Sequence, residues 1–183
     1  MIMETLETDR LILTAWTKKD AEALFDYAKN PNVGPSAGWK PHSDPHESKR
    51  IIKDVFMRGD VWKIALKGSD KAIGSIGLDN DKRRPGVASR ELGYSLSEEY
   101  WGRGLMTEAA AEVIRYAFEK MDMEILAVNT GIDNVRSQHV IEKLGFTYEG
   151  TERHSYLVYD STVRDIRCYS MYRYEWEQLQ QTE

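Results

Sequence analysis

Hydrophobic and polar residues alternate in some parts of this 183-residue chain and recur at helical spacing in others. A period of two is typical of a half-buried strand, and apolar residues three to four positions apart are typical of an amphipathic helix. In the first half, a segment rich in Gly and Pro follows the first helical pattern, and a short polar turn joins two strands as a hairpin. The predicted strands are 6–16, 61–67 and 72–78, the predicted helices are 20–29 and 45–58, and 33–45 is predicted to be a loop.

The second half of the chain shows the same two patterns in alternation. Leu92, Tyr94 and Leu96 fall on one side of a predicted strand, and the apolar residues between Leu105 and Phe118 recur at helical spacing. The order of elements predicts one mixed α/β domain over residues 1–183, with no linker inside it. In this half the predicted strands are 91–96, 124–131, 146–159 and 166–176, and the predicted helices are 105–120 and 133–143.

The connection between strand 91–96 and the next helix has the composition of an anion-binding turn. It contains Gly102 and Gly104, which allow positive φ or a close approach of the backbone to a ligand, and Arg103 adds a positive charge between them. The first N–H groups of the helix lack partners within it and lie at the positive end of its dipole. An ordinary strand–helix turn explains these glycines equally well, so the motif by itself leaves both interpretations open.

Three stretches, taken together and in this order, carry a resemblance to a known family. The segment WGRGLMTEA at 101–109 resembles the acetyl-CoA-binding signature of the GNAT (Gcn5-related) N-acetyltransferases. The segment NVRSQHVIEKLGF at 134–146 resembles a later motif of that family, and TDRLILT at 8–14 resembles its first strand. Tyr100 and Trp101 before the first glycine are similar to the branch that contains the RimJ/RimL-like ribosomal-protein N-terminal acetyltransferases. The resemblance covers essentially the whole chain.

The resemblance implies a fold and a reaction. The fold is a mixed, mostly antiparallel sheet of seven strands flanked by about four helices, with a V-shaped split between parallel strands 91–96 and 124–131. The unpaired backbone groups of such a split can bind the pantetheine arm of acetyl-CoA as an added strand would. The implied activity is acetyl-CoA-dependent transfer of an acetyl group to a primary amine by direct attack on the thioester. The acceptor is either a protein N-terminal amine or a small-molecule amine.

The resemblance also implies which residues bind acetyl-CoA. The pyrophosphate is expected on the backbone amides at the start of the helix, where Met106 stands in a place that usually holds Gly or Ala. Asn134 is expected to bond the pantetheine arm, with Ser137 near the thioester sulfur, although Asn134 could instead simply cap its helix. The expected cofactor-binding residues are Leu96, Ser97, Trp101, Gly102, Arg103, Gly104, Leu105, Met106, Thr107, Asn134 and Ser137.

Amine acetylation also needs groups that move protons. The amine must lose a proton, the leaving thiol must gain one, and the developing oxyanion needs a donor. Glu91 is the expected base, with a surface ion pair as the alternative, and Tyr94 is a donor to the carbonyl. Ser137 is the preferred acid and Tyr148 the second choice, while a backbone N–H at residue 96 or 97 is the expected oxyanion donor. Trp39, in the 33–45 loop, is expected to contact the acceptor, with anchoring of that loop onto the core as the alternative. Asn129, across the split from Glu91, is also expected to contact the acceptor.

Composition bears on the partners, the location and the metal content of the protein. The formal net charge of −5 argues against a nucleic-acid partner, and the absence of a long apolar run argues against a membrane partner, so a cytoplasmic protein is expected. The single cysteine, Cys168, is expected to be a buried strand thiol, and no metal site is expected. Monomer and homodimer both remain open. The main functional alternative is a non-catalytic acyl-CoA-binding module that retains the groove without turnover.

Overall fold

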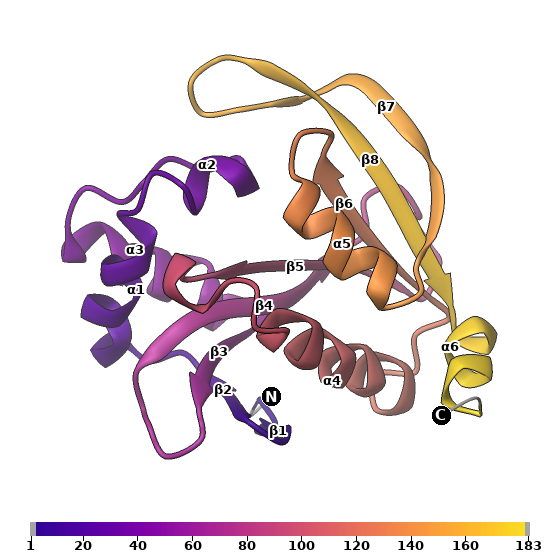
Figure 1. The fold of residues 1–183 in the computed structure, drawn as a ribbon, viewed down its shortest axis with the longest axis horizontal. Coiled ribbons are helices and arrows are strands. Elements are labelled where there is room, and N and C mark those ends of the chain that lie inside the picture. Colours follow the sequence, from indigo (N-terminus) through magenta and orange to yellow (C-terminus); the bar gives the residue numbers. More distant parts are fainter. Residues whose placement is uncertain (1–2, 182–183) are drawn as a thin grey trace.

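The computed structural model describes residues 3–181, which form one eight-stranded sheet with helices on its faces (Figure 1). The strand order is β1-β2-β3-β4-β5-β6-β8-β7, and every neighbouring pair is antiparallel except β5 and β6. The strands are β1 Leu6–Glu7, β2 Leu11–Ala15, β3 Asp60–Leu66, β4 Ala72–Asn80, β5 Ser89–Leu96, β6 Ile125–Gly131, β7 Thr147–Leu157 and β8 Val163–Tyr172. The helices are α1 Ala21–Ala28, α2 Gly34–Ala37, α3 Pro45–Asp54, α4 Leu105–Glu119, α5 Val135–Lys143 and α6 Arg173–Gln180.

The parallel pair β5 and β6 is joined over only half its length. Pairing runs from Ser89 opposite Ile125 to Leu92 opposite Val128 and stops there. The outer edges stay paired further along, since β5 remains bonded to β4 through Leu96 and β6 to β8 through Gly131. The inner edges therefore diverge and leave backbone groups of both strands without a partner strand. This confirms the predicted split, and β5 and β6 diverge near the middle of Figure 1.

Helices cover the sheet on both faces through two apolar clusters. The larger cluster contains the buried face of α4, including Ala109 and Val113, together with inward-facing residues of the central strands. The smaller cluster packs α1 and α3 together. Ala72 belongs to the smaller cluster and its neighbour Ile73 to the larger, and successive strand side chains point to opposite faces of a sheet. The two sets of helices therefore lie on opposite faces, as the alternation of apolar residues requires.

The predicted first strand, 6–16, is two strands joined by a tight turn. Thr8 closes the turn, because its N–H donates to the Leu11 carbonyl at 3.0 Å and its hydroxyl accepts from the Leu11 N–H at 3.0 Å. β1 then folds back against β2, which adds a strand to the seven expected. The four residues between Leu6 and Leu11 are all polar, which marks the reversal that the prediction of one continuous strand missed.

Two further predictions differ from the structure. The 33–45 segment contains the short helix α2, which Gly38 ends in the left-handed conformation with φ 89°. The predicted strand 166–176 ends at Tyr172, and the chain continues as α6. Glu175 stabilises the start of α6 by accepting the Tyr172 N–H at 2.8 Å, and Trp176 packs on Phe118. The aromatic composition of this segment favours a strand, but contact with α4 favours the helix. Within residues 3–181, no helix has both the length and the hydropathy that crossing a membrane requires.

Candidate active site

The turn before α4 has open space around its two glycines. Gly102 and Gly104 have φ of 73° and 74°, a conformation that L side chains rarely adopt, and Gly104 is the N-cap of α4. A Cβ placed on Gly102 would meet nothing within 4 Å, and one on Gly104 would meet only the Arg10 Nη2 atom, at 3.7 Å. Arg10 of the β1–β2 turn contacts this segment: it donates to the Arg103 carbonyl at 3.0 Å and forms an ion pair with Glu108 at 2.6 Å. The positive φ that the sequence allowed for these two glycines is therefore present.

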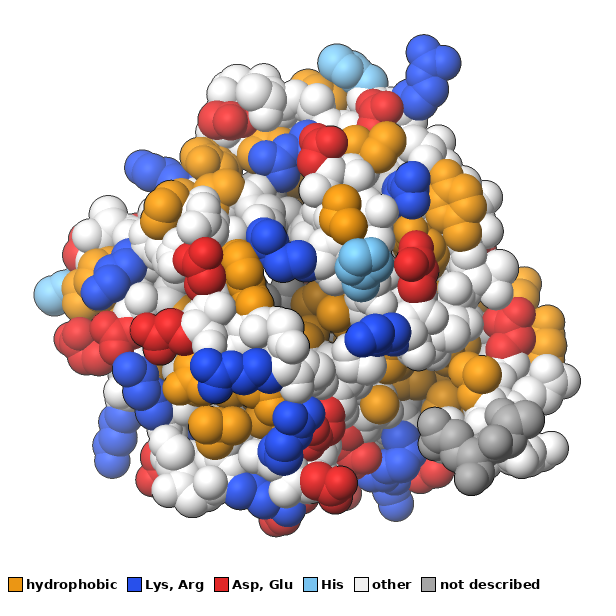
Figure 2. All heavy atoms as spheres, in the orientation of Figure 1, with side chains coloured by type: hydrophobic (Ala, Val, Ile, Leu, Met, Phe, Trp, Pro, Cys, Tyr) orange, Lys and Arg blue, Asp and Glu red, His pale blue; other side chains and the backbone are white. Residues whose placement is uncertain are grey.

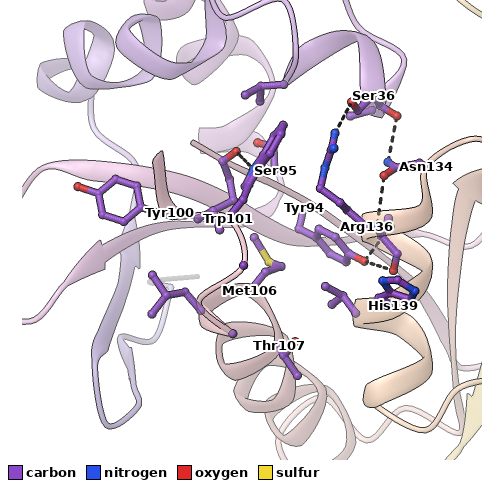
Figure 3. A pocket seen from close by; sticks show the side chains of 18 of the residues that line it. Ser36, Tyr94, Ser95, Tyr100, Trp101, Met106, Thr107, Asn134, Arg136 and His139 are labelled. Carbon is purple, nitrogen blue, oxygen red and sulfur yellow. Dashed lines mark hydrogen bonds between the residues drawn. The ribbon is translucent and has the colours of Figure 1, made fainter. Parts of the chain in front are cut away.

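A first cavity of about 290 Å³ lies between this turn, α5 and the end of α2 (Figure 3). Most of the residues predicted to bind the cofactor line it. These are Leu96, Trp101, Gly102, Gly104, Leu105, Met106, Thr107, Asn134 and Ser137. Although Met106 lines the cavity, its side chain is largely buried in the core.

Two residues predicted for the cofactor site do not line this cavity. The Ser97 N–H donates to the Ile73 carbonyl at 2.8 Å, so it is engaged by β4. The Arg103 guanidinium lies 5.3 Å from the centre of the Tyr100 ring. Backbone groups along a strand alternate in direction, so sequence spacing alone does not tell whether residue 96 or residue 97 faces the split.

Trp101 forms a fixed wall of the first cavity. Its Nε1–H donates to the Leu96 carbonyl at 2.8 Å, and the Arg136 guanidinium lies 3.9 Å from the centre of its ring. A hydrogen bond in the ring plane and a cation over the ring face together determine the orientation of the indole. The Trp101 side chain therefore closes the cavity on the side of the turn.

Three residues of α5 that sequence reasoning did not assign to the site line the same cavity. Arg136, His139 and Lys143 lie at i, i+3 and i+7, which is one face of a helix. Figure 2 shows a hollow near the centre of this face of the molecule, with Lys and Arg side chains around it. This periodic row of basic side chains was the sequence signal that could have identified them. His139 is exposed and also lines the cavity.

Tyr94, Ser137 and Asn134 line the cavity and are joined by hydrogen bonds, which Figure 3 marks with dashed lines. The Tyr94 hydroxyl and the Ser137 hydroxyl are 2.9 Å apart. Asn134 caps α5 by accepting the Ser137 N–H at 3.2 Å, and its amide N–H donates to the Ser36 carbonyl of α2 at 3.2 Å. Burial raises the pKa of Tyr94 to about 12, so its hydroxyl keeps its proton near neutral pH. The capping alternative considered for Asn134 is thus present in the structure.

A second cavity, of about 560 Å³, lies next to the first. The two share Ser36, Ala37, Tyr94, Asn134 and Ser137 as common walls. The second cavity is also lined by Glu91 and Asn129, which brings together two residues that the sequence placed on different strands. Trp39 and Tyr148 line neither cavity.

Trp39 and Tyr148, which line neither cavity, make other contacts within the protein. Trp39 packs on Gly34, where an added Cβ would lie 2.5 Å from the Trp39 ring, and its ring centre is 5.4 Å from that of His42. Tyr148 is about half exposed and bonds Thr151 at 2.6 Å. The loop-anchoring alternative for Trp39 therefore describes its position better than a substrate wall does.

Glu91 lies opposite Ala127 in the paired part of β5, one residue before the last β5–β6 pair, and its side chain is about one-third exposed. Its carboxylate is 3.9 Å from the Arg83 guanidinium, and that guanidinium is bound more tightly by Glu152, at 2.7 Å and 2.8 Å. Glu152 holds the pKa of Arg83 above its ordinary value, so this charge is permanent. The ion-pair alternative for Glu91 thus has a partner in Arg83, while the adjacent Arg90 binds Asn80. Among residues 3–181, no cluster of three or more His, Cys, Asp or Glu side chains is placed to hold a metal ion.

Comparison with known proteins agrees with this architecture. The family model described as acetyltransferase (GNAT) domain matches residues 10–147. The chain is 30% identical over 171 residues to the uncharacterized N-acetyltransferase YoaA of Bacillus subtilis, covering 91% of this chain and 95% of YoaA. It is 29% identical over 170 residues to the [ribosomal protein uS5]-alanine N-acetyltransferase of Escherichia coli, covering 87% and 86% of the two chains.

A solved GNAT-family acetyltransferase from Bacillus anthracis has the same fold. It superposes with a TM-score of 0.84 at 20% identity, over 94% of this chain and 100% of that one. The family match covers more than half of the chain. The two relatives are named as N-acetyltransferases, and the alignments cover most of each of them. The chain therefore belongs to the GNAT family and is an N-acetyltransferase.

Proposed function

We propose that this enzyme transfers an acetyl group from acetyl-CoA directly to a primary amine, either a protein N-terminus or a small-molecule amine. The observation that carries the proposal is that two cavities meet at one hydrogen-bonded group, Tyr94, Ser137 and Asn134. A cofactor in the first cavity and an acceptor in the second would meet at these side chains. Direct transfer between two bound substrates requires such a junction.

The residues of the first cavity suit acetyl-CoA. The amides at the start of α4 face open space and can bind a pyrophosphate, and Arg136 and Lys143 add positive charge on the facing helix. The unpaired stretch of β5 beyond Leu92 offers backbone groups to an extended pantetheine arm. Because Met106 is largely buried, its bulk is accommodated by the core.

The same strand supplies a donor for the acetyl oxygen. Bound acetyl-CoA would supply an activated acetyl group, which an uncharged amine attacks. The Ser97 N–H points to β4, and N–H groups on a strand alternate in direction, so the Leu96 N–H points into the split. We therefore assign the oxyanion-donor role to Leu96 and not to Ser97. A backbone donor held by a paired strand needs little reorganisation when charge develops on the oxygen.

Proton transfer is assigned to groups on both sides of the junction. Glu91 lines the second cavity and would take the proton from the amine, directly or through water. Tyr94 and Ser137 share a hydrogen bond, and the raised pKa of Tyr94 keeps a proton in this pair. Ser137 would give its proton to the leaving thiolate and take the Tyr94 hydroxyl proton, which water would then return to Tyr94. Asn134 holds the backbone of Ser137 in place.

The experiment that tests this function is calorimetric titration with acetyl-CoA followed by a free-thiol release assay over a panel of amines. The panel includes ribosomal-protein N-terminal peptides, because one relative is named as a [ribosomal protein uS5]-alanine N-acetyltransferase. Saturable binding and thiol release with at least one amine are expected. Failure to bind acetyl-CoA would refute the cofactor assignment, and binding without turnover on any amine would point to the non-catalytic module.

A further inference from the structure

The second cavity has more positive than negative side chains around it. Lys82, Arg83 and Arg164 line it, against the single carboxylate of Glu91. Arg83 is already bound by Glu152 and lies near Glu91, so its charge is balanced within the protein. Lys82 and Arg164 have no carboxylate within 4.0 Å among the residues that the structure describes. The cavity therefore carries an excess of positive charge.

Arg164 is the better placed of these two cations. It lies on β8 and is half-buried, with its stem running beside Gly131 of β6. One of its N–H groups donates to the Pro35 carbonyl of α2 at 2.7 Å, which orients the guanidinium. Hydrogen bonds from Thr162 are the main cause of the lowered pKa of the exposed Asp160 in the hairpin turn, and the Arg164 charge adds a smaller contribution. A guanidinium has five N–H donors, so an oriented Arg164 retains donors for a ligand in the cavity.

Asn129 supplies a second donor in the same cavity. It is the first residue of β6 beyond the last β5–β6 pair, so it lies where the split opens. Its amide nitrogen is buried and has no hydrogen-bond acceptor within the described part of the chain. Leaving a buried donor unpaired is costly, and in an enzyme this pattern is typical of a group that waits for a ligand oxygen.

We propose that the acceptor is an amine that also carries a carboxylate. This inference rests on the proposed function and adds the acceptor's chemical class. The carboxylate would bind Arg164 and the Asn129 amide, with Lys82 adding positive charge at the exposed rim, while the amine lies toward Glu91 and Tyr94. The α-carboxylate of a free amino acid and an acidic first side chain of a peptide share this chemistry. Polyamines and other purely cationic amines would meet the excess positive charge and bind poorly.

The test uses two matched pairs of acceptors with the intact enzyme and acetyl-CoA. Alanine is compared with alaninamide, and aspartyl-alaninamide with asparaginyl-alaninamide, so that each pair differs only in one carboxylate. The wild-type enzyme is expected to prefer the acid in at least one pair by about 10- to 100-fold in kcat/KM, as a charged hydrogen bond predicts. The pair that shows the preference identifies the source of the carboxylate.

Variants then locate the preference. Arg164→Gln is expected to bring the acid-to-amide ratio close to one, mainly through KM, and Asn129→Asp, which keeps the side-chain shape, to reverse it. Arg153→Gln is the matched control, because Arg153 is exposed on the same hairpin and lines neither cavity. It should leave the ratio unchanged. Acetyl-CoA affinity, measured by calorimetry, should be the same in Arg164→Gln as in the wild type.

The outcomes separate this inference from the proposed function. Turnover of acids and amides at equal rates, or an acid preference that survives Arg164→Gln, would overturn the carboxylate site and leave the acetyl transfer intact. Calorimetric binding of the acids but not of the amides, without thiol release, would support the carboxylate site and overturn the proposed chemistry. An acid preference that Arg164→Gln removes and Arg153→Gln retains would support both.

Discussion

A single methyl group at Gly104 tests the cofactor site without disturbing the core. Gly104 is the N-cap of α4 with φ 74°, and a Cβ there would have only the Arg10 guanidinium within 4 Å. Gly104→Ala therefore has two separable effects. The first is backbone strain, about 1–2 kcal/mol for an L residue in this conformation, which should lower the free energy of unfolding. The second is intrusion of the methyl group into the space where a phosphate must approach the amides of α4.

The second effect should dominate the affinity for acetyl-CoA. Losing one or two hydrogen bonds between backbone N–H groups and a charged phosphate amounts to about 2–4 kcal/mol. That range corresponds to roughly a 30- to 1,000-fold increase in Kd. A β-branched residue, as in Gly104→Val, should abolish measurable binding, because it adds bulk at the same point and strains the backbone further.

Gly68→Ala is the matched control for backbone strain. Gly68 has φ 83°, has no atom within 4 Å of a built Cβ, and lies in the turn between β3 and β4. Urea denaturation should show a similar loss of stability in both variants, and calorimetric titration should show weakened acetyl-CoA binding only in Gly104→Ala. Equal Kd values for the two variants would refute the assignment of the phosphate site to this turn.

Three other predictions follow from contacts in the structure. Ser137→Ala should lower kcat about tenfold while changing the Kd for acetyl-CoA little, because it removes the hydroxyl 2.9 Å from Tyr94 that is assigned as the acid. Arg136→Gln should raise the Kd for acetyl-CoA by about tenfold and weaken its dependence on salt, because one cation of the cavity is lost. Burial raises the pKa of Asp20, but hydrogen bonds, chiefly from Lys63, lower it more, so the carboxylate titrates below its ordinary value of 3.8. Asp20→Asn should therefore cost about 1–3 kcal/mol of unfolding free energy at pH 7, and this difference from the wild type should shrink as the pH falls below 3.8.

Each of these predictions has its own contradicting result. An unchanged kcat in Ser137→Ala would remove this residue from the acid role. For Arg136→Gln the control is Arg115→Gln, since Arg115 pairs with Glu112 and Glu119 on α4 and does not line the cavity; equal effects of the two would contradict a local role. A stability difference that stays constant between pH 7 and pH 2 in urea denaturation would show that the Asp20 charge does not contribute.

The local elements and the glycine turn before α4 could be predicted because their causes are local. Alternation in β5 and the helical spacing of apolar residues in α4 follow from burial of one face. Gly102 and Gly104 adopt the positive φ that only glycine readily takes, so their presence indicated the turn. The motif resemblance also predicted that Asn134 and Ser137 lie at the same site as this turn, and both line the first cavity.

Errors arose where contacts distant in the chain outweigh local preference. The segment after Tyr172 is rich in aromatic residues, yet it forms α6 because Trp176 can pack on Phe118 there. The short helix α2 depends on side chains from other elements, since the Pro35 and Ser36 carbonyls accept from Arg164 and Asn134. No local pattern reports these partners, so the segment looked like a plain loop.

The secondary structure of most segments and the family could thus be deduced from the amino-acid sequence. The arrangement of the residues that line the second cavity could not. Periodicity and motif residues report how each segment behaves next to its neighbours in the chain. The second cavity instead collects Glu91, Asn129 and Arg164 from three different strands. Their proximity depends on strand order, on the point where β5 and β6 separate, and on the path of the last hairpin. Those features arise only when the whole sheet assembles, because strand pairing joins residues that are far apart in the chain.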